Sequence, residues 1–87
     1  MSYLVNMSIV GGEFKCEVGG LLTHDECAGW MNYYMRLAKL EGFEFRHEAD
    51  PYTWDLRGFK EDGTIIQISK HLQEPINYVE MFREDTK

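Results

Sequence analysis

The stretch from Thr23 to Gly42 repeats its apolar side chains with the period of an α-helix. Thr23 and Glu26 form a capping-box pattern, because each side chain can satisfy a backbone N–H group that the first helical turn leaves free. Gly42 can adopt the left-handed conformation that ends many helices. The pattern therefore predicts one long helix bounded by Thr23 and Gly42.

The predicted helix has a wider apolar arc than packing on one sheet face requires. At about 100° per residue, the polar positions form one narrow stripe: Asp25, Gly29, Asn32, Arg36 and Lys39. The residues opposite this stripe are expected to face the core: Cys27, Met31, Tyr34 and Ala38. Tyr33 and Leu40 reach almost to the polar stripe. Either loops or a C-terminal segment cover these flanks, or Tyr33 and its neighbours form a surface that binds a partner.

The N-terminal segment predicts a β-hairpin. Residues 3–10 and 13–18 alternate apolar and polar side chains, and Gly11-Gly12 supplies a two-residue turn that tolerates positive φ angles. With this turn every apolar side chain lies on one face of the hairpin. The expected pairs are Ile9 with Phe14, Met7 with Cys16, and Val5 with Val18.

Three further strands are predicted after the helix. The first covers residues 43–49 and directs Phe43, Phe45 and Ala49 inward. Asp50-Pro51 separates it from a second strand over residues 52–59. The third strand contains Ile66 and Ile68, which are expected to share a face with Tyr52, Trp54, Leu56 and Gly58 of the second.

The loop between the last two predicted strands sets their register. A two-residue Asp62-Gly63 turn would place Arg57 opposite Ile68, which breaks the apolar face. A three-residue loop with Gly63 in the left-handed conformation keeps that face whole. We therefore predict the longer loop, which pairs Leu56 with Ile68 and Gly58 with Ile66.

A short C-terminal helix is predicted from Pro75, because Pro favours the first helical position and apolar residues follow at Ile76, Val79 and Phe82. It is expected to cover the apolar side chains of the far sheet face: Leu4, Phe59 and Ile65. The predicted fold class is α+β, with a mostly antiparallel sheet of about five strands (β-β-α-β-β-β) and the long helix packed on one face. Residues 1–87 form a single domain.

Composition adds limits on location. With 44% hydrophobic and 14% aromatic residues, the chain can bury its own core. It has no apolar run near the ~20 residues of a membrane span and no N-terminal export signal, so a cytoplasmic protein is expected. Cys16 and Cys27 are interpreted as reduced core residues, and a Cys16–Cys27 bridge is the alternative.

The net charge of −6 bears on the kind of partner. Residues 44–87 hold ten acidic and six basic side chains, so most of the excess lies in the second half. Phosphate backbones repel such a chain, which disfavours direct nucleic-acid binding. A larger protein with a basic surface is the more natural partner, and the alternative is that the charge serves solubility. The far sheet face is expected to be net acidic: Lys15, Glu17, Glu44, Arg46, Glu48, Asp55 and Arg57.

The residues that could do chemistry are scattered. The cysteines and histidines lack the spacing of a metal site, and the glycine pairs do not match a phosphate-binding loop. His24 and Cys27 could share one helix face, but no third residue marks an oriented thiol nucleophile. We therefore expect no catalytic residue, no metal site and no cofactor.

A compact, acidic α+β chain of this length without catalytic motifs resembles, in general type, the small inhibitors encoded by phages and mobile elements, anti-CRISPR proteins among them. This resemblance implies a non-enzymatic module that blocks a basic, nucleic-acid-handling host protein. The expected partner-binding residues are Tyr33, Glu44, Glu48, Asp50, Tyr52 and Asp55. The alternative is a structural or adaptor subunit that forms a homodimer through its aromatic-rich helix.

Overall fold

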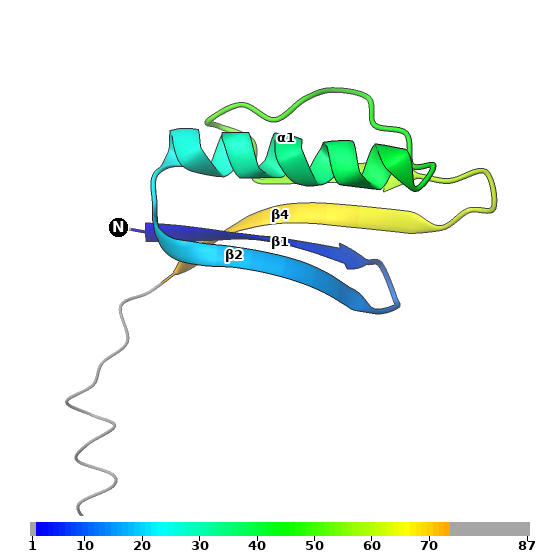
Figure 1. The fold of residues 1–87 in the computed structure, drawn as a ribbon, viewed down its shortest axis with the longest axis horizontal. Coiled ribbons are helices and arrows are strands. Elements are labelled where there is room, and N and C mark those ends of the chain that lie inside the picture. The colour runs from blue at the N-terminus through cyan, green and yellow to red at the C-terminus, as the bar shows by residue number, and fades with distance from the viewer. Residues whose placement is uncertain (1, 74–87) are drawn as a thin grey trace, which may run out of the picture.

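A computed structural model describes residues 2–73, which form one helix packed on one face of a four-stranded antiparallel sheet (Figure 1). The elements are β1 (Ser2–Ile9), β2 (Phe14–Leu22), α1 (His24–Leu40), β3 (Asp55–Phe59) and β4 (Ile65–Gln73). The strand order is β2-β1-β4-β3, so the first and last strands lie side by side at the centre. The α+β class is confirmed, and the described sheet has four strands where about five were predicted.

The helix has the predicted ends. The backbone N–H of Thr23 donates to Glu26 Oε1 at 2.9 Å, and the N–H of Glu26 donates to Thr23 Oγ1 at 3.2 Å. Gly42 has a φ of 100° just after the helix. All four residues predicted to face the core are buried: Cys27, Met31, Tyr34 and Ala38.

The core lies between α1 and the sheet face beneath it. Its largest fully buried side chains come from the helix, β1 and β4: Met31, Met35, Ile66, Ile68, Val5 and Cys27. Full burial of an aliphatic or Met side chain contributes about 1.5–3 kcal/mol. The alternation predicted for the strands holds at the centre of the sheet, where Val5, Ile66 and Ile68 are fully buried.

The hairpin differs from the prediction at its turn. The pairs Val5–Val18 and Met7–Cys16 are confirmed, but Phe14 lies opposite Ser8 and not Ile9. The turn closes one residue early, because the N–H of Gly12 donates to the carbonyl of Ile9 at 3.0 Å and Gly11 takes a φ of 73°. The register shift makes Lys15 the extra residue of a β-bulge. Phe14 thereby leaves the core face and is 60% exposed.

The bulge also turns Lys15 away from the far sheet face where it was predicted. Lys15 Nζ lies 3.1 Å from Glu41 Oε1 at the end of α1 and 3.7 Å from Glu13 Oε1. The hydrogen bond to Glu41 is the largest cause of a raised pKa at Lys15. The far face keeps a polar row across its middle: Glu17, Asn6, Ser69 and Asp55.

The predicted strand over residues 43–49 is wrong. Only Glu44 pairs with the sheet, through two backbone hydrogen bonds with Phe59 at 2.9 and 3.0 Å. Farther along, the backbone of Ala49 pairs with the side chain of Asn32 on α1, which takes the place of a neighbouring strand. Because a helix side chain satisfies this backbone, the segment continues as a loop.

The last two strands have the predicted register. Leu56 pairs with Ile68 and Gly58 with Ile66, and Gly63 has a φ of 88° in a three-residue loop. The first of these strands begins at Asp55, three residues later than predicted, because residues 50–53 form a turn. Tyr52 and Trp54 therefore precede the strand and are exposed, whereas the alternation placed them on the core face. The C-terminal helix predicted from Pro75 lies outside the described residues.

Candidate functional site

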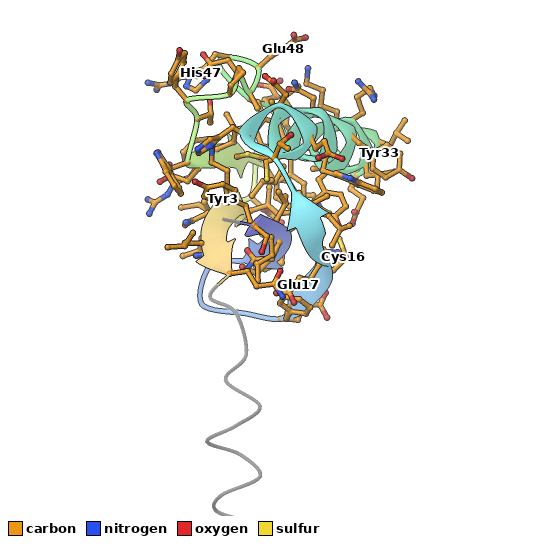
Figure 2. All side chains as sticks on the ribbon, turned by 90° about the vertical axis from the view of Figure 1, so that its left-hand side faces the viewer. Tyr3, Cys16, Glu17, Tyr33, His47 and Glu48 are labelled. Atoms are coloured by element: carbon orange, nitrogen blue, oxygen red, sulfur yellow. The ribbon has the colours of Figure 1, made fainter. Side chains whose placement is uncertain are left out.

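The connection between α1 and β3 carries most of the predicted partner-binding residues. We call residues 41–55 the acidic loop, because it holds five carboxylates and one arginine, a net charge of −4 with His47 neutral. Figure 2 shows His47 and Glu48 at the outer tip of this loop, on the opposite side of α1 from Tyr33. Glu44, Glu48 and Asp55 are exposed to solvent.

The acidic loop is fixed at its start by packing on β3. Phe43 is buried in the core, and Glu44 makes the two backbone bonds to Phe59. The ring of Phe45 packs against Gly58, where any Cβ atom would collide with the ring carbons. These contacts fix the backbone at Glu44, whose side chain is exposed to solvent.

The middle of the acidic loop is held by α1. Asn32 Nδ2 donates to the carbonyl of Ala49 at 2.9 Å, and Asn32 Oδ1 accepts the N–H of Ala49 at 2.8 Å. A side-chain amide that both donates and accepts reproduces the pairing of a backbone strand. The residue next to this clamp is Glu48, so its position depends on Asn32.

Asp50 shapes the turn that follows. Its Oδ1 accepts the N–H of Tyr52 at 2.8 Å and the hydroxyl of Thr53 at 3.1 Å. A carboxylate bound to its own turn in this way is an Asx-type motif. Asp50, predicted as a partner-binding residue, therefore has one oxygen engaged in folding the loop, whereas Tyr52 is 87% exposed.

The end of the acidic loop is tied to a buried lysine. Lys70 on β4 is 3% exposed, and its Nζ donates to the carbonyl of Pro51 at 2.9 Å and to His24 Nδ1 at 2.8 Å. The ammonium lies 4.5 Å from the ring centroid of Trp54 and 5.7 Å from that of Tyr3. Buried ammonium groups require such compensation by hydrogen bonds and aromatic faces.

The rings around Lys70 contact one another, so they form a box. The centroids of Tyr3 and His24 are 4.3 Å apart, and Trp54 lies 5.9 Å from each of them. Because an ammonium only donates, Nδ1 of His24 accepts the hydrogen bond. In a neutral imidazole the proton is then on Nε2.

This lysine box was missed by sequence reasoning. The signal was present, because Lys70 continues the alternation of Ile66 and Ile68 and so falls on the core face of β4. Its partners could not be inferred, since they come from β1, α1 and the acidic loop.

A hollow of about 490 Å³ opens beside the box, between the start of α1 and the end of the acidic loop. It is lined by His24, Asp25, Pro51, Tyr52 and Trp54. Trp54 is 50% exposed, and together with Tyr52 it offers aromatic surface next to the carboxylate of Asp25. Aromatic faces beside a carboxylate favour cationic side chains such as Arg or Lys.

Of the two residues considered for catalysis, Cys27 lies in the core and His24 belongs to the lysine box. Cys27 is fully buried, and burial is the main cause of its raised pKa, which disfavours the reactive thiolate. Nδ1 of His24 accepts a hydrogen bond from Lys70 Nζ. Both cysteines are free thiols.

Within residues 2–73 no three His, Cys, Asp or Glu side chains are grouped so that they could hold a metal ion. In the same part of the chain, no helix has the length and apolar character needed to span a membrane.

Tyr33 is separated from the other predicted partner-binding residues. It lies on the flank of α1 away from the acidic loop (Figure 2) and is 44% exposed. The ring of Trp30 meets it edge to face, with centroids 5.8 Å apart and planes at 88°. The six predicted residues therefore occupy two surfaces. Comparison of the chain with protein-family models, curated proteins and solved structures finds no match.

Proposed function

We propose that this protein is a small, acidic, non-enzymatic binding module whose acidic loop occupies a basic surface on a larger protein. The target class is a nucleic-acid-handling host protein, and the mode is inhibition by occupying its basic surface, as in phage and mobile-element inhibitors of the anti-CRISPR type. The free thiols of Cys16 and Cys27 suit a cytoplasmic setting.

The observation that supports this proposal is the combination of charge and order in the acidic loop. The loop has a net charge of −4 but is held by Phe59, Asn32 and Lys70. Ordering a mobile loop on binding costs affinity, and a loop that is already ordered avoids most of that cost. Exposed carboxylates also steer a basic partner toward the site.

Tyr52 and Trp54 supply the apolar part of the proposed contact. Interfaces gain most of their affinity from a few aromatic or Arg residues, with charged groups around them that set orientation. Both rings are exposed beside the hollow near Asp25. A basic side chain of the partner would stack on this aromatic surface while the loop carboxylates meet its neighbours.

The test is capture of binding proteins from bacterial lysate by the tagged protein at low and high salt. We expect a large basic protein that is retained at low salt and released at high salt. The triple variant with Glu44→Lys, Glu48→Lys and Asp55→Lys should no longer capture this basic protein. With purified partners, its affinity should be reduced by at least about tenfold.

A matched control keeps the same change in net charge. The variant Glu13→Lys, Glu17→Lys, Glu61→Lys reverses three carboxylates outside the acidic loop and should retain most of the binding. Equal loss in both variants would mean that the attraction depends on net charge alone. Unchanged affinity in the acidic-loop variant would refute the proposal.

A further inference from the structure

A second row of apolar side chains runs along α1, apart from the row that faces the sheet. Its members are separated by three, four and three residues, which is the spacing of a helix–helix seam: Trp30, Tyr33, Leu37 and Leu40. Trp30 is 38% exposed, Tyr33 44% and Leu40 86%. We call this row the outer seam.

A shallow hollow lies at Gly29, beside Trp30 and Tyr33 of the outer seam. Gly29 lies in the interior of α1, and a Cβ atom built there would meet nothing within 4 Å. A glycine inside a helix costs about 1 kcal/mol relative to alanine. Packing within residues 2–73 does not require it, because the space beside it is open. Glu26, Gly29, Trp30 and Tyr33 line this hollow of about 290 Å³.

The outer seam contains a protruding side chain. Leu40, the last residue of α1, is the most exposed aliphatic side chain of the described residues. It follows Gly29 by 11 residues, which places it about 16 Å along the helix and within about 20° of Gly29 around the axis. The hollow and the protrusion therefore lie on one line along one face.

We propose that the outer seam binds a second copy of this chain, with the two α1 helices antiparallel. In that arrangement Leu40 of each copy enters the hollow at Gly29 of the other, and Tyr33 of each meets Leu37 of the other. A two-fold contact requires one surface to carry both halves of the complementary pair. The missing Cβ at Gly29 provides room for the incoming leucine.

The edges of the sheet do not offer an equally good contact between copies. The edge strand β2 is interrupted by two register shifts and carries the bulged Lys15, features that hinder pairing with another strand. The edge of β3 is partly covered by the backbone pairing of Glu44 with Phe59. An apolar seam on a helix is thus the available self-complementary surface of the described residues.

The size of the contact and the charge of the chain set how the dimer behaves. One helix face gives less than the roughly 1,200 Å² of a stable interface, so association is weak and reversible, with a dissociation constant on the order of 0.1 mM. Each copy has a net charge of −6, and salt screens the repulsion between copies. Higher salt should therefore strengthen the dimer.

The test is sedimentation equilibrium of the full chain between about 10 μM and about 1 mM at two salt concentrations. We expect the mass to rise from monomer toward dimer with concentration, more so at high salt. Gly29→Gln fills the hollow with a residue that favours a helix, and Leu40→Gln removes the protrusion. Each substitution should raise the dissociation constant of the dimer by at least about tenfold. Val10→Gln, at another exposed apolar position, is the control and should leave it unchanged.

The two tryptophans report the location of the contact in the same sample. In NMR spectra recorded over the concentration series, the indole N–H of Trp30 should shift, whereas that of Trp54 at the lysine box should stay fixed. A monomer mass at every concentration would overturn the proposal. So would a dimer that is unaffected by both Gly29→Gln and Leu40→Gln, or one that shifts Trp54 alone.

Discussion

The acidic loop and the outer seam flank α1 on opposite sides, and they are built in opposite ways (Figure 2). The acidic loop is irregular in backbone but is held by bonds to Phe59, Asn32 and Lys70. The outer seam is regular helix, yet it leaves Leu40 in solvent and the space at Gly29 open. In this protein an irregular loop can thus have its contacts satisfied within the chain, while a regular helix leaves apolar side chains without contacts. Salt should weaken binding at the charged surface and strengthen it at the apolar one.

Breaking the lysine box should have the largest effect, because the box joins the acidic loop to α1, β1 and β4. Lys70→Met keeps the length of the side chain but removes the donor to Pro51 and His24. We expect the free energy of unfolding to fall by about 2–3 kcal/mol, as for buried hydrogen bonds from a charged group. Urea denaturation measures this change.

Lys60→Met is the matched control for Lys70→Met. Lys60 also lies over an aromatic ring, with its Nζ 4.8 Å from the centroid of Phe43, but it is only partly buried. Its replacement should cost less than about 1 kcal/mol. Equal stability of the Lys70→Met variant and the unaltered protein would show that the box does not anchor the loop.

Releasing the clamp at Asn32 should loosen the acidic loop while leaving the outer seam as it is. Asn32→Ala removes both hydrogen bonds to Ala49 but also improves helix propensity, so the net loss of unfolding free energy should be only about 1 kcal/mol. Hydrogen exchange of the Ala49 amide should become much faster, with exchange in α1 near Trp30 unchanged. Slow exchange at Ala49 in this variant would contradict the assigned role of Asn32.

Filling the open space at Gly29 should stabilise the monomer, although a larger residue there is expected to weaken the proposed dimer. Gly29→Ala should raise the free energy of unfolding by about 1 kcal/mol, because the helix gains propensity and meets no clash. Thermal unfolding should shift upward by several degrees. Gly58→Ala is the opposite case: its Cβ would strike the ring of Phe45, so the melting temperature should fall. If Gly29→Ala destabilises the monomer, the glycine has a structural role within the chain.

The last effect is absent at neutral pH and concerns Tyr34, whose ring lies beside those of Trp30 and Tyr33. Burial, followed by the neighbouring Cys16, raises the pKa of Tyr34 to about 12 from a usual value of 10.0. The unfolded chain therefore loses this proton first, and stability should fall as the pH rises between 10.0 and about 12. Tyr34→Phe should reduce this alkaline loss, which unfolding curves across that pH range would show. An identical alkaline loss in both proteins would contradict the assignment.

Local sequence signals predicted the parts of the fold that depend on local chemistry. The capping box at Thr23 and the left-handed Gly63 each follow from neighbouring residues, and both are confirmed. One error arose where a distant group changed a local choice, and the other arose within the hairpin turn itself. Asn32 on the helix takes the backbone bonds of Ala49, and the early turn at Gly11 rotates Phe14 out of the core.

The candidate site shows the same limit. Glu44, Glu48, Tyr52 and Asp55 fall in one region because they are close in sequence, whereas Tyr33 lies on another surface of the helix. The lysine box joins residues from β1, α1, the acidic loop and β4, and no single segment contains its pattern. The alternation of Lys70 with Ile68 indicates its burial but not the partners that make burial tolerable.

The central position of β1 has a consequence for how the chain folds during synthesis. β1 pairs with β4 along its whole length, from Ser2 opposite Gln73 to Ile9 opposite Ile66. β1 must therefore wait for β4 before the middle of the sheet can close, and contacts between distant residues slow folding. Until Gln73 has left the ribosome, the β1–β2 hairpin and α1 lack the strand that completes their core. The nascent chain is therefore expected to stay incompletely folded up to that point.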